Sequence, residues 1–340
     1  MNILNCGERS EGGSKDALPE PPVNNTSTAL VPAVEEVVPI MFLATELSPF
    51  VIVCLKTARK YNPEVPIYMV TSEHSVKPDG PMIDLLGIPN VHVKVIERYL
   101  GAGTDSALFH ERYIHQSVTA VPFERFCFQR FMVLRDIANE EGVQRFLHMD
   151  YDIALFTDAR TFSQFDADLV ALNTHSTFFS LWKMPLLQRF CDYMLEFYVR
   201  PQAEIASDWD QYGEHLKGEQ FNGTFIQFSD MFMLYSFLDK HKDSVTTKFL
   251  VFDQGDFTPD YLQYWAMVNL QNFIGWDCLQ DDFNKYVKWD RNERGMLVPI
   301  ANGTMLQGIH WQGFMCKQIA PLIMGPILED EGQAKRLRYL

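Results

Sequence analysis

The chain has 340 residues, of which 47% are hydrophobic and 21% are charged, so a globular protein with a sizeable core is expected. Its formal net charge of −15 argues against a nucleic-acid partner, which requires a basic surface, and against an anionic membrane. No apolar run approaches the roughly 20 residues that span a bilayer, and no secretory signal is recognised, so we expect no transmembrane segment and a cytoplasmic location. The six cysteines form no Cys-x-x-Cys pair, which favours small buried side chains over a disulfide framework or a zinc site.

The beginning of the chain differs in composition from the rest. Residues 1–36 are rich in Gly, Ser, Pro, Asn and Glu, and they cannot bury enough apolar area to offset the entropy of ordering them. They predict a flexible tail. We expect the remainder, residues 37–340, to form a single domain.

The next segments alternate between strand and helix patterns. Ser48 and Pro49 make a good N-cap and first residue for a helix over 48–62. A shorter helix is expected at 81–88. Short apolar runs predict three strands between and around these helices, at 37–45, 65–73 and 90–97. Strand, helix and strand joined by short links predict a parallel sheet that is covered on both faces.

Residues 100–173 continue this pattern after one irregular stretch. Weak periodicity at 100–121 predicts a surface loop, and 123–142 predicts an amphipathic helix that Gly142 ends. Strands follow at 143–149 and 165–173. The first half is therefore predicted to be an open, doubly wound α/β sheet.

The second half has fewer clean periods. Residues 180–199 predict a helix, and 225–241 are compatible with strand, helix or both. Residues 303–321 predict a strand that ends at His310 and a turn at Gly313.

Two carboxylates, Asp150 and Asp152, interrupt the apolar run RFLHMDYDIALF at the end of a predicted strand. Ligands of open α/β sheets bind at the carboxyl ends of the strands, and side chains two residues apart point the same way in extended backbone. Tyr151 between them would then turn away. Two converging carboxylates repel unless a cation lies between them, which favours a site for Mn²⁺ or Mg²⁺. An ordinary acidic turn is the alternative.

Two other Asp-x-Asp triplets lack this context. Asp166 and Asp168 precede a predicted strand, so they lie at the wrong end of it. Asp208 and Asp210 lie in polar sequence, where solvated acids need no explanation.

Three segments resemble a known class of enzymes. RFLHMDYDIALFTDARTF is similar to the Asp-x-Asp segment of GT-A glycosyltransferases, and FERFCFQRFMVL to the helix that precedes it there. GIHWQGFMCK resembles the H-x-x-G-x-x-K segment of the family-8 retaining glycosyltransferases. Lys317 lies one residue further from the glycine than in that pattern, and the following Pro-Trp is missing. The resemblance covers roughly residues 38–173 and 300–320.

The resemblance implies a GT-A-like fold and a metal-dependent transferase that uses a nucleotide sugar, with UDP as the favoured carrier. Residues 37–173 would bind the nucleotide sugar and 174–340 the acceptor, with 303–321 contributing to the metal and diphosphate site. The implied metal ligands are Asp150, Asp152 and His310. The implied donor-binding residues are Ala44, Thr45, Glu46, Thr71, Arg130, Asp150, Tyr151, Gly313 and Lys317. Thr45 is equally compatible with the start of a turn, and Arg130 with a solvated helix residue.

A catalytic base for the acceptor hydroxyl would be needed only by an inverting enzyme. Asp230 is the foremost candidate because it lies inside an apolar run, and Asp210 is the next, with Asp208 and Glu219 as rivals. In a retaining enzyme, which the resemblance favours, Asp230 would orient donor or acceptor instead.

Other functions remain open alternatives. A glycosidase is disfavoured because Asp150 and Asp152 lie too close together to flank a scissile bond. A nucleotidyltransferase would carry a glycine-rich basic loop after the first strand, where ATELSPF has neither. A non-catalytic protein that binds sugar nucleotides or glycans is the third alternative. The sequence does not predict the donor sugar, the acceptor or the oligomeric state.

Overall fold

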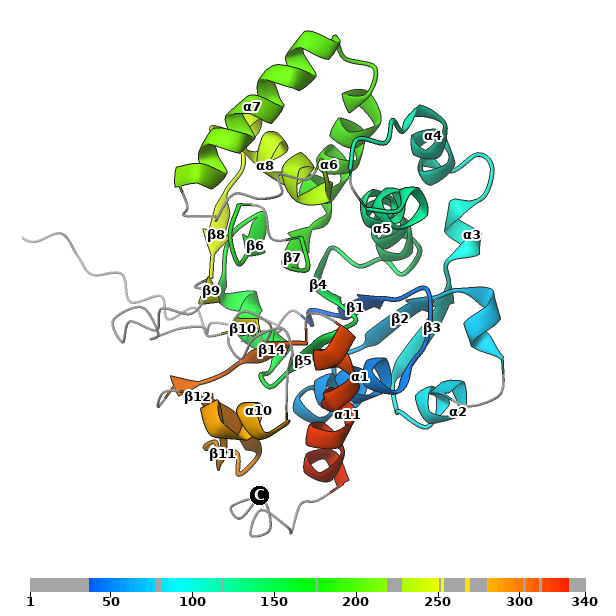
Figure 1. The fold of residues 1–340 in the computed structure, drawn as a ribbon. Coiled ribbons are helices and arrows are strands. Elements are labelled where there is room, and N and C mark those ends of the chain that lie inside the picture. The colour runs from blue at the N-terminus through cyan, green and yellow to red at the C-terminus, as the bar shows by residue number, and fades with distance from the viewer. Residues whose placement is uncertain are drawn as a thin grey trace, which may run out of the picture. The chain divides into compact units, whose positions relative to one another are not determined.

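The computed structural model describes ten segments of the chain, which belong to one compact unit, Glu36–Leu340 (Figure 1). They are residues 37–77, 81–117, 119–174, 177–218, 228–250, 252–253, 267–269, 280–301, 304–311 and 314–329. The predicted tail at 1–36, Glu219 and Gly313 lie outside them. No helix within these segments is long and apolar enough to cross a membrane.

A seven-stranded sheet forms the centre of the unit. Its order is β3 (Val91–Val95), β2 (Ile67–Thr71), β1 (Ile40–Leu43), β4 (Arg145–Asp150), β7 (Phe179–Lys183), β6 (Leu169–Ala171) and β8 (Thr247–Phe249). The first four strands are parallel, β7 is antiparallel to both its neighbours, and β6 and β8 are parallel. This arrangement confirms the predicted α/β class with a mostly parallel central sheet.

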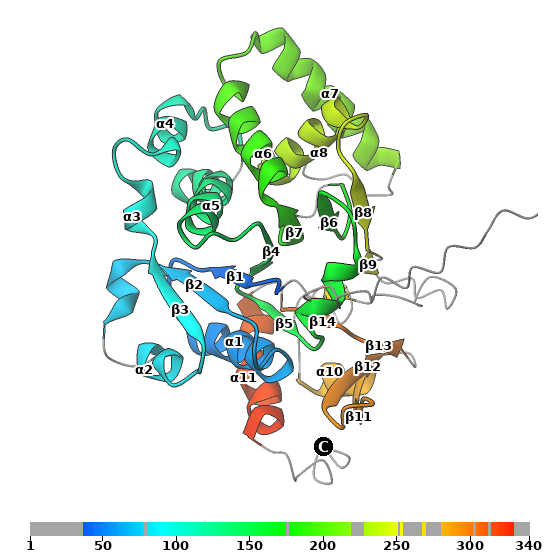
Figure 2. The same ribbon diagram turned by 180° about the vertical axis from the view of Figure 1, so that it is seen from behind.

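Helices cover both faces of the sheet, as Figures 1 and 2 show. Met41 and Leu43 of β1 pack into the core formed by α5 (Val121–Glu140), α6 (Met184–Phe197) and α8 (Asp230–His241). Ile40 and Phe42 pack on the opposite face with α1 (Pro49–Tyr61) and α2 (Pro81–Leu86). Successive strand residues point to opposite faces, so a strand buried on both faces must be apolar throughout. That requirement explains the uninterrupted apolar run of β1.

Two smaller sheets are also found among the described residues. One has the order β5 (Ile153–Leu155), β14 (Gly308–His310), β10 (Met267–Asn269) and β9 (Phe252–Asp253). The other contains β11 (Val287–Arg291), β12 (Leu297–Ala301) and β13 (Thr304–Met305). The remaining helices of the described residues are α3 (Glu97–Leu100), α4 (Asp105–Arg112), α7 (Gln202–Gly218), α10 (Gln280–Tyr286) and α11 (Phe314–Glu329), with short 3₁₀ helices η1 (Glu73–Val76) and η2 (Ala159–Gln164).

Several predicted elements were wrong or incomplete. The predicted loop at 100–121 contains α4, whose N-cap Thr104 accepts a hydrogen bond from the backbone N–H of Ala107. The predicted helix at 180–199 is β7 followed by α6, and Pro185 marks the start of the helix. Residues 230–241 form α8.

The C-terminal segment is only partly as predicted. The strand does end at His310, but residues 314–329 form α11, a helix that was not predicted. Cys316 in this helix is disulfide-bonded, whereas the sequence favoured small buried side chains over a disulfide framework. Ala320 of α11 and Val53 of α1 are buried in a shared third core cluster, so the C-terminal helix packs against the first.

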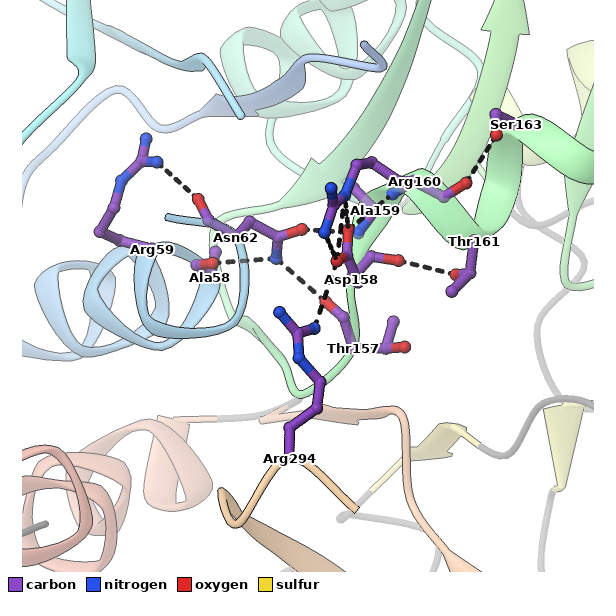
Figure 3. A network of polar contacts seen from close by, with 10 residues as sticks. All are labelled: Ala58, Arg59, Asn62, Thr157, Asp158, Ala159, Arg160, Thr161, Ser163 and Arg294. Atoms are coloured by element: carbon purple, nitrogen blue, oxygen red, sulfur yellow. Dashed lines mark hydrogen bonds and ion pairs between the residues drawn. The ribbon is translucent and has the colours of Figure 1, made fainter. Parts of the chain in front are cut away.

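Asn62 joins the end of α1 to the turn that follows β5 (Figure 3). Its Nδ2 donates to the carbonyls of Ala58 at 2.9 Å and Thr157 at 3.0 Å, and its Oδ1 accepts from the N–H of Ala159 at 2.5 Å. Next to it, Arg294 reaches Asp158 at 3.2 Å and ties the third sheet to the same turn. These bonds hold β5 in place, and β5 directly follows Asp152, one of the two acids at the end of β4.

Candidate active site

A cavity of about 400 Å³ opens at the carboxyl end of β4. Its floor comes from the ends of β1 and β4, and its walls come from α5, the start of α8 and the C-terminal segment. The lining residues are Leu43, Thr45, Phe123, Glu124, Phe126, Cys127, Arg130, Asp150, Tyr151, Asp152, Thr177, Phe178, Ser229, Asp230, Met231, His310 and Lys317. Of the thirteen predicted site residues, eight line this cavity, four do not, and Gly313 lies outside the described residues.

Arg130 holds together three polar groups from distant parts of the chain. Its guanidinium donates to Asp150 at 2.7 Å, to Asp230 at 2.5 Å and to Thr177 at 2.8 Å. Burial would raise the pKa of Asp150, but Arg130, with smaller contributions from His148 and His310, lowers that pKa to about 2. Arg130 is itself only 8% exposed, so it is a buried cation rather than a solvated helix residue. The arrangement places the carboxylates of Asp150 and Asp230 on one guanidinium group.

Asp152 is paired separately from Asp150. Its Oδ2 lies 2.8 Å from Nζ of Lys317, and its Oδ1 lies 3.3 Å from Nε2 of His310. Burial would raise the pKa of Asp152, but His310 and then Lys317 outweigh burial and lower it. Oδ1 of Asp152 and Nδ1 of His310 are buried and have no hydrogen-bond partner among the described residues. Such unsatisfied atoms are costly and call for an explanation.

The pairing of β5 with β14 brings the two ends of the site together. His310 lies opposite Ile153 in the antiparallel register, and the N–H of Trp311 donates to the carbonyl of Asp152 at 2.9 Å. His310 is therefore placed beside Asp152 by backbone hydrogen bonds. Lys317 then reaches the carboxylate from the first turn of α11.

Tyr151 does not turn away from the site. A turn rather than extended backbone follows Asp150, so strict alternation fails there and Tyr151 lines the same cavity as both acids. Nζ of Lys317 lies 4.7 Å from the centre of the Tyr151 ring, and the Phe50 ring lies 5.8 Å away. A cation over an aromatic face is stabilised by the ring quadrupole. Tyr151 thus helps to hold Lys317 against Asp152.

The predicted metal ligands are only partly assembled. Within the segments that the structure describes, no three His, Cys, Asp or Glu side chains are gathered so that they could hold a metal ion. Asp152 and His310 fit such an ion, since a carboxylate oxygen without a hydrogen bond faces an imidazole nitrogen. Asp150 is instead engaged by Arg130.

The other predicted donor residues divide into two groups. Thr45 lines the cavity. Ala44 is buried beside it, Glu46 is exposed, and Thr71 is buried at the end of β2; these three do not line the cavity.

The two predicted catalytic acids lie in different surroundings. Asp230 is 5% exposed and lines the cavity at the first residue of α8. Asp210 is exposed on α7 and is not part of the lining. Its neighbour Asp208, which was expected to be solvated, is buried and bonded to Arg200 and Lys240.

Several lining residues were not singled out from the sequence. Glu124 and Cys127 lie on the same face of α5 as Arg130, at a spacing of three residues. That spacing could have indicated from the sequence that they share a surface with Arg130. Thr177 precedes β7, a strand that the sequence did not indicate. Phe178 stacks on His310 with ring centres 4.7 Å apart, and no local sequence pattern predicts that contact.

No protein-family profile and no curated protein matches the chain. Among solved structures it aligns with mouse xyloside xylosyltransferase 1 in its apo form, at 12% identity over 63% of this chain and 84% of that one, with a TM-score of 0.40. An active-site mutant of LgtC is 10% identical over 81% of this chain and 87% of LgtC, with a TM-score of 0.37. The glycosyltransferase GlyE of Streptococcus pneumoniae TIGR4 is 12% identical over 62% of this chain and 45% of that one, with a TM-score of 0.34. Scores of this size do not bear on the reaction, which must be argued from the site.

Proposed function

We propose that this protein is a metal-dependent glycosyltransferase of the GT-A type that takes a nucleotide diphosphate sugar, UDP-linked by preference, and transfers the sugar to a hydroxyl acceptor. One observation carries the proposal. Two acids at the carboxyl end of a central strand share a cavity with an imidazole and a lysine that come from about 160 residues further along the chain. This combination suits a diphosphate and a divalent cation.

Asp152 and His310, with Asp150 as the third ligand, would hold Mn²⁺ or Mg²⁺. The cation would supply Lewis-acid stabilisation of the charge that develops on the leaving diphosphate. Lys317 lies within reach of the same place and would pair with a phosphate oxygen. Because Lys317 is bonded to Asp152, the ammonium and a metal ion compete for that carboxylate.

Asp230 is assigned to binding the donor sugar. Arg130 fixes its carboxylate through a 2.5 Å ion pair, and a fixed carboxylate accepts hydrogen bonds from sugar hydroxyls without reorganisation. Because Arg130 already occupies this carboxylate, we assign Asp230 to orienting the donor rather than to taking a proton, which agrees better with a retaining than with an inverting reaction.

A second function is favoured by the same ion pairs. Asp150 and Asp152 are each neutralised by a side-chain cation, Arg130 and Lys317. A protein that binds sugar nucleotides without a metal and without catalysis would be compatible with that charge balance.

Thermal shift with UDP- and GDP-sugars, in the presence and absence of Mn²⁺, tests the two functions. We expect a UDP-sugar to raise the melting temperature only when Mn²⁺ is present, and Asp152→Asn to abolish that rise because one ligand is lost. Asp166→Asn is the matched control, since Asp166 belongs to another Asp-x-Asp triplet and its side chain is fully exposed. A metal-independent rise without product would support the second function, and no rise with any sugar nucleotide would refute both.

A further inference from the structure

Glu124 is a buried carboxyl group that the proposed reaction has not used. It lies in the first turn of α5, is 2% exposed and lines the cavity. Its Oε2 accepts hydrogen bonds from the hydroxyls of Thr119 and Ser117, the latter at 3.2 Å. Its Oε1 is buried and has no hydrogen-bond partner among the described residues. One oxygen is therefore held in place while the other is unsatisfied.

A structural role explains only part of this arrangement. A carboxylate in the first turn of a helix is favoured by the helix dipole. That effect does not require burial, and it does not account for an acceptor atom left without a donor, which costs free energy. Burial, opposed by the Thr119 bond and reinforced by Asp230, raises the pKa of Glu124. The group is thus destabilised in its charged form, as is common where a ligand completes the hydrogen bonding.

The direction of α5 places Glu124 at the outer part of the cavity. α5 ends at Glu140, with four residues between it and the start of β4, and its residue Arg130 bonds Asp150 at the carboxyl end of β4. The helix therefore runs antiparallel to β4, and its first turn lies toward the carboxyl ends of the strands. Six residues separate Glu124 from Arg130, which is about 9 Å along a helix axis at roughly 1.5 Å per residue. Arg130 marks the position of Asp150 and Asp230. With the donor sugar at Asp230 as proposed, Glu124 would lie beyond it, on the side from which an acceptor would approach.

A second cavity adjoins the same two chain segments. It measures about 340 Å³ and is lined by Gln116, Ile205, Ala206, Trp209 and Phe228. Gln116 precedes Ser117, which bonds Glu124, and Phe228 precedes Ser229, which lines the first cavity. Trp209 is half-buried and packs on Phe228, with ring centres 5.4 Å apart. An aromatic surface of this kind suits the apolar face of a sugar ring.

We propose that Glu124 binds a hydroxyl group of a carbohydrate acceptor through its Oε1 atom, and that the remainder of this glycoside extends toward Trp209. The inference rests on the proposed glycosyl transfer. It assigns the acceptor class and a residue that determines acceptor binding.

The test compares Glu124→Gln and Glu124→Ala with the wild type in steady-state transfer from UDP-sugars. The acceptor probes are para-nitrophenyl glycosides of glucose, galactose and xylose. We expect the KM for the acceptor to rise about tenfold in Glu124→Gln and further in Glu124→Ala, with a much smaller change in the KM for the donor. Trp209→Leu should raise the acceptor KM as well. Glu111→Gln is the control, because Glu111 is exposed on α4 and outside both cavities.

The outcomes separate this inference from the proposed function. The inference would be overturned if folded Glu124→Gln and Glu124→Ala had an unchanged KM for the glycoside, or if only the KM for the donor changed. Transfer by the wild type would still support the proposed function in that case. Donor binding by the wild type with no transfer to any glycoside would overturn the acceptor class. A lower melting temperature with unaltered acceptor KM would assign Glu124 a structural role only. No binding of any UDP-sugar by the wild type would refute the proposed function itself.

Discussion

Arg130 controls the charge balance of the cavity at the scale of single residues. It is the cation common to Asp150 and Asp230, and removing it would leave two buried carboxylates next to each other. Removing one partner of a buried ion pair lowers stability by more than the intact pair contributes to it, because the other charge stays buried without a partner. The sequence placed Arg130 on the helix before the acids, as a candidate donor-binding residue or a solvated helix residue. Its contact with Asp230, 100 residues away, depends on how α5 and α8 pack.

Replacing Arg130 with Met tests this balance. We expect the free energy of unfolding at pH 7 to fall by about 3 kcal/mol, as measured by urea denaturation. Adding Asp150→Asn to Arg130→Met should recover part of the loss because one of the two charges is removed. Arg98→Met is the control, since the Arg98 side chain is 69% exposed and its ion pair with Glu140 should contribute less than about 1 kcal/mol. Equal losses for Arg130→Met and Arg98→Met would contradict the assigned role.

At the scale of elements, short polar bridges position the strands that carry the site. Asn62 fastens α1 to the turn after β5, and Asp208 joins the end of α6, α7 and α8 through Arg200, Lys240 and Ser236. The sequence did not reveal either bridge. Each one joins residues that are far apart in the chain, whereas periodicity and capping patterns report only on neighbours.

Asn62→Ala should weaken the attachment of β5. The change leaves the buried N–H of Ala159 and the carbonyl of Thr157 without their partner, so we expect a loss of about 2–4 kcal/mol in the free energy of unfolding. Chemical denaturation measures this loss. Asn139→Ala is the matched control, because Asn139 is exposed near the end of α5 and should change stability by less than about 0.5 kcal/mol.

Asp208 predicts a pH-dependent contribution to stability. Burial would raise its pKa, but Lys240 and Arg200 lower it below the ordinary value of about 3.9. A lowered pKa means that the folded state binds fewer protons, so the contribution is present above about pH 4 and is lost as the pH falls through the folded pKa. Asp208→Asn should therefore cost about 1–3 kcal/mol at pH 7 and progressively less below pH 4.

Urea denaturation at pH 7 and at steps from pH 5 to pH 3 measures the difference. Asp210→Asn is the control, since Asp210 is exposed on the same helix. A difference between wild type and Asp208→Asn that stayed constant down to pH 3 would rule out the ion-pair explanation.

At the scale of the whole molecule, the site is closed by a long-range strand pair. β5 and β14 join residues near 153 to residues near 310 in antiparallel register. The alternation of β1, α1 and β2 was predictable because complete burial of central strands leaves an apolar signature in the sequence. β5 and β14 have three residues each, too few for a period to show, and β7 runs directly into α6. The closeness of His310 to Asp152 was therefore expected only from the family resemblance. Its physical cause is the pairing of β14 with β5, and neither strand is recognisable from its local sequence.

Hydrogen exchange can test whether the two ends of the site respond together. We expect Mn²⁺ with UDP to slow amide exchange in residues 150–155 and 308–311 in parallel, because ligation of Asp152 and His310 would stabilise the pair of strands that carries them. Peptides from β2 and β3 provide the internal reference and should change little. Protection of only one of the two segments would show that they do not act as a unit.

The pairing of β5 with β14 also bears on biosynthesis. A nascent chain that has emerged only as far as residue 300 contains Asp150, Asp152 and Arg130, but neither His310 nor Lys317. Until translation passes that point, Asp152 lacks both partners that lower its pKa, and the edge of β5 lacks the strand that covers it. Non-local pairings of this kind form late and leave apolar strand edges open to association with other chains. The ribosome-bound intermediate therefore exposes a strand edge that the full-length chain covers with β14.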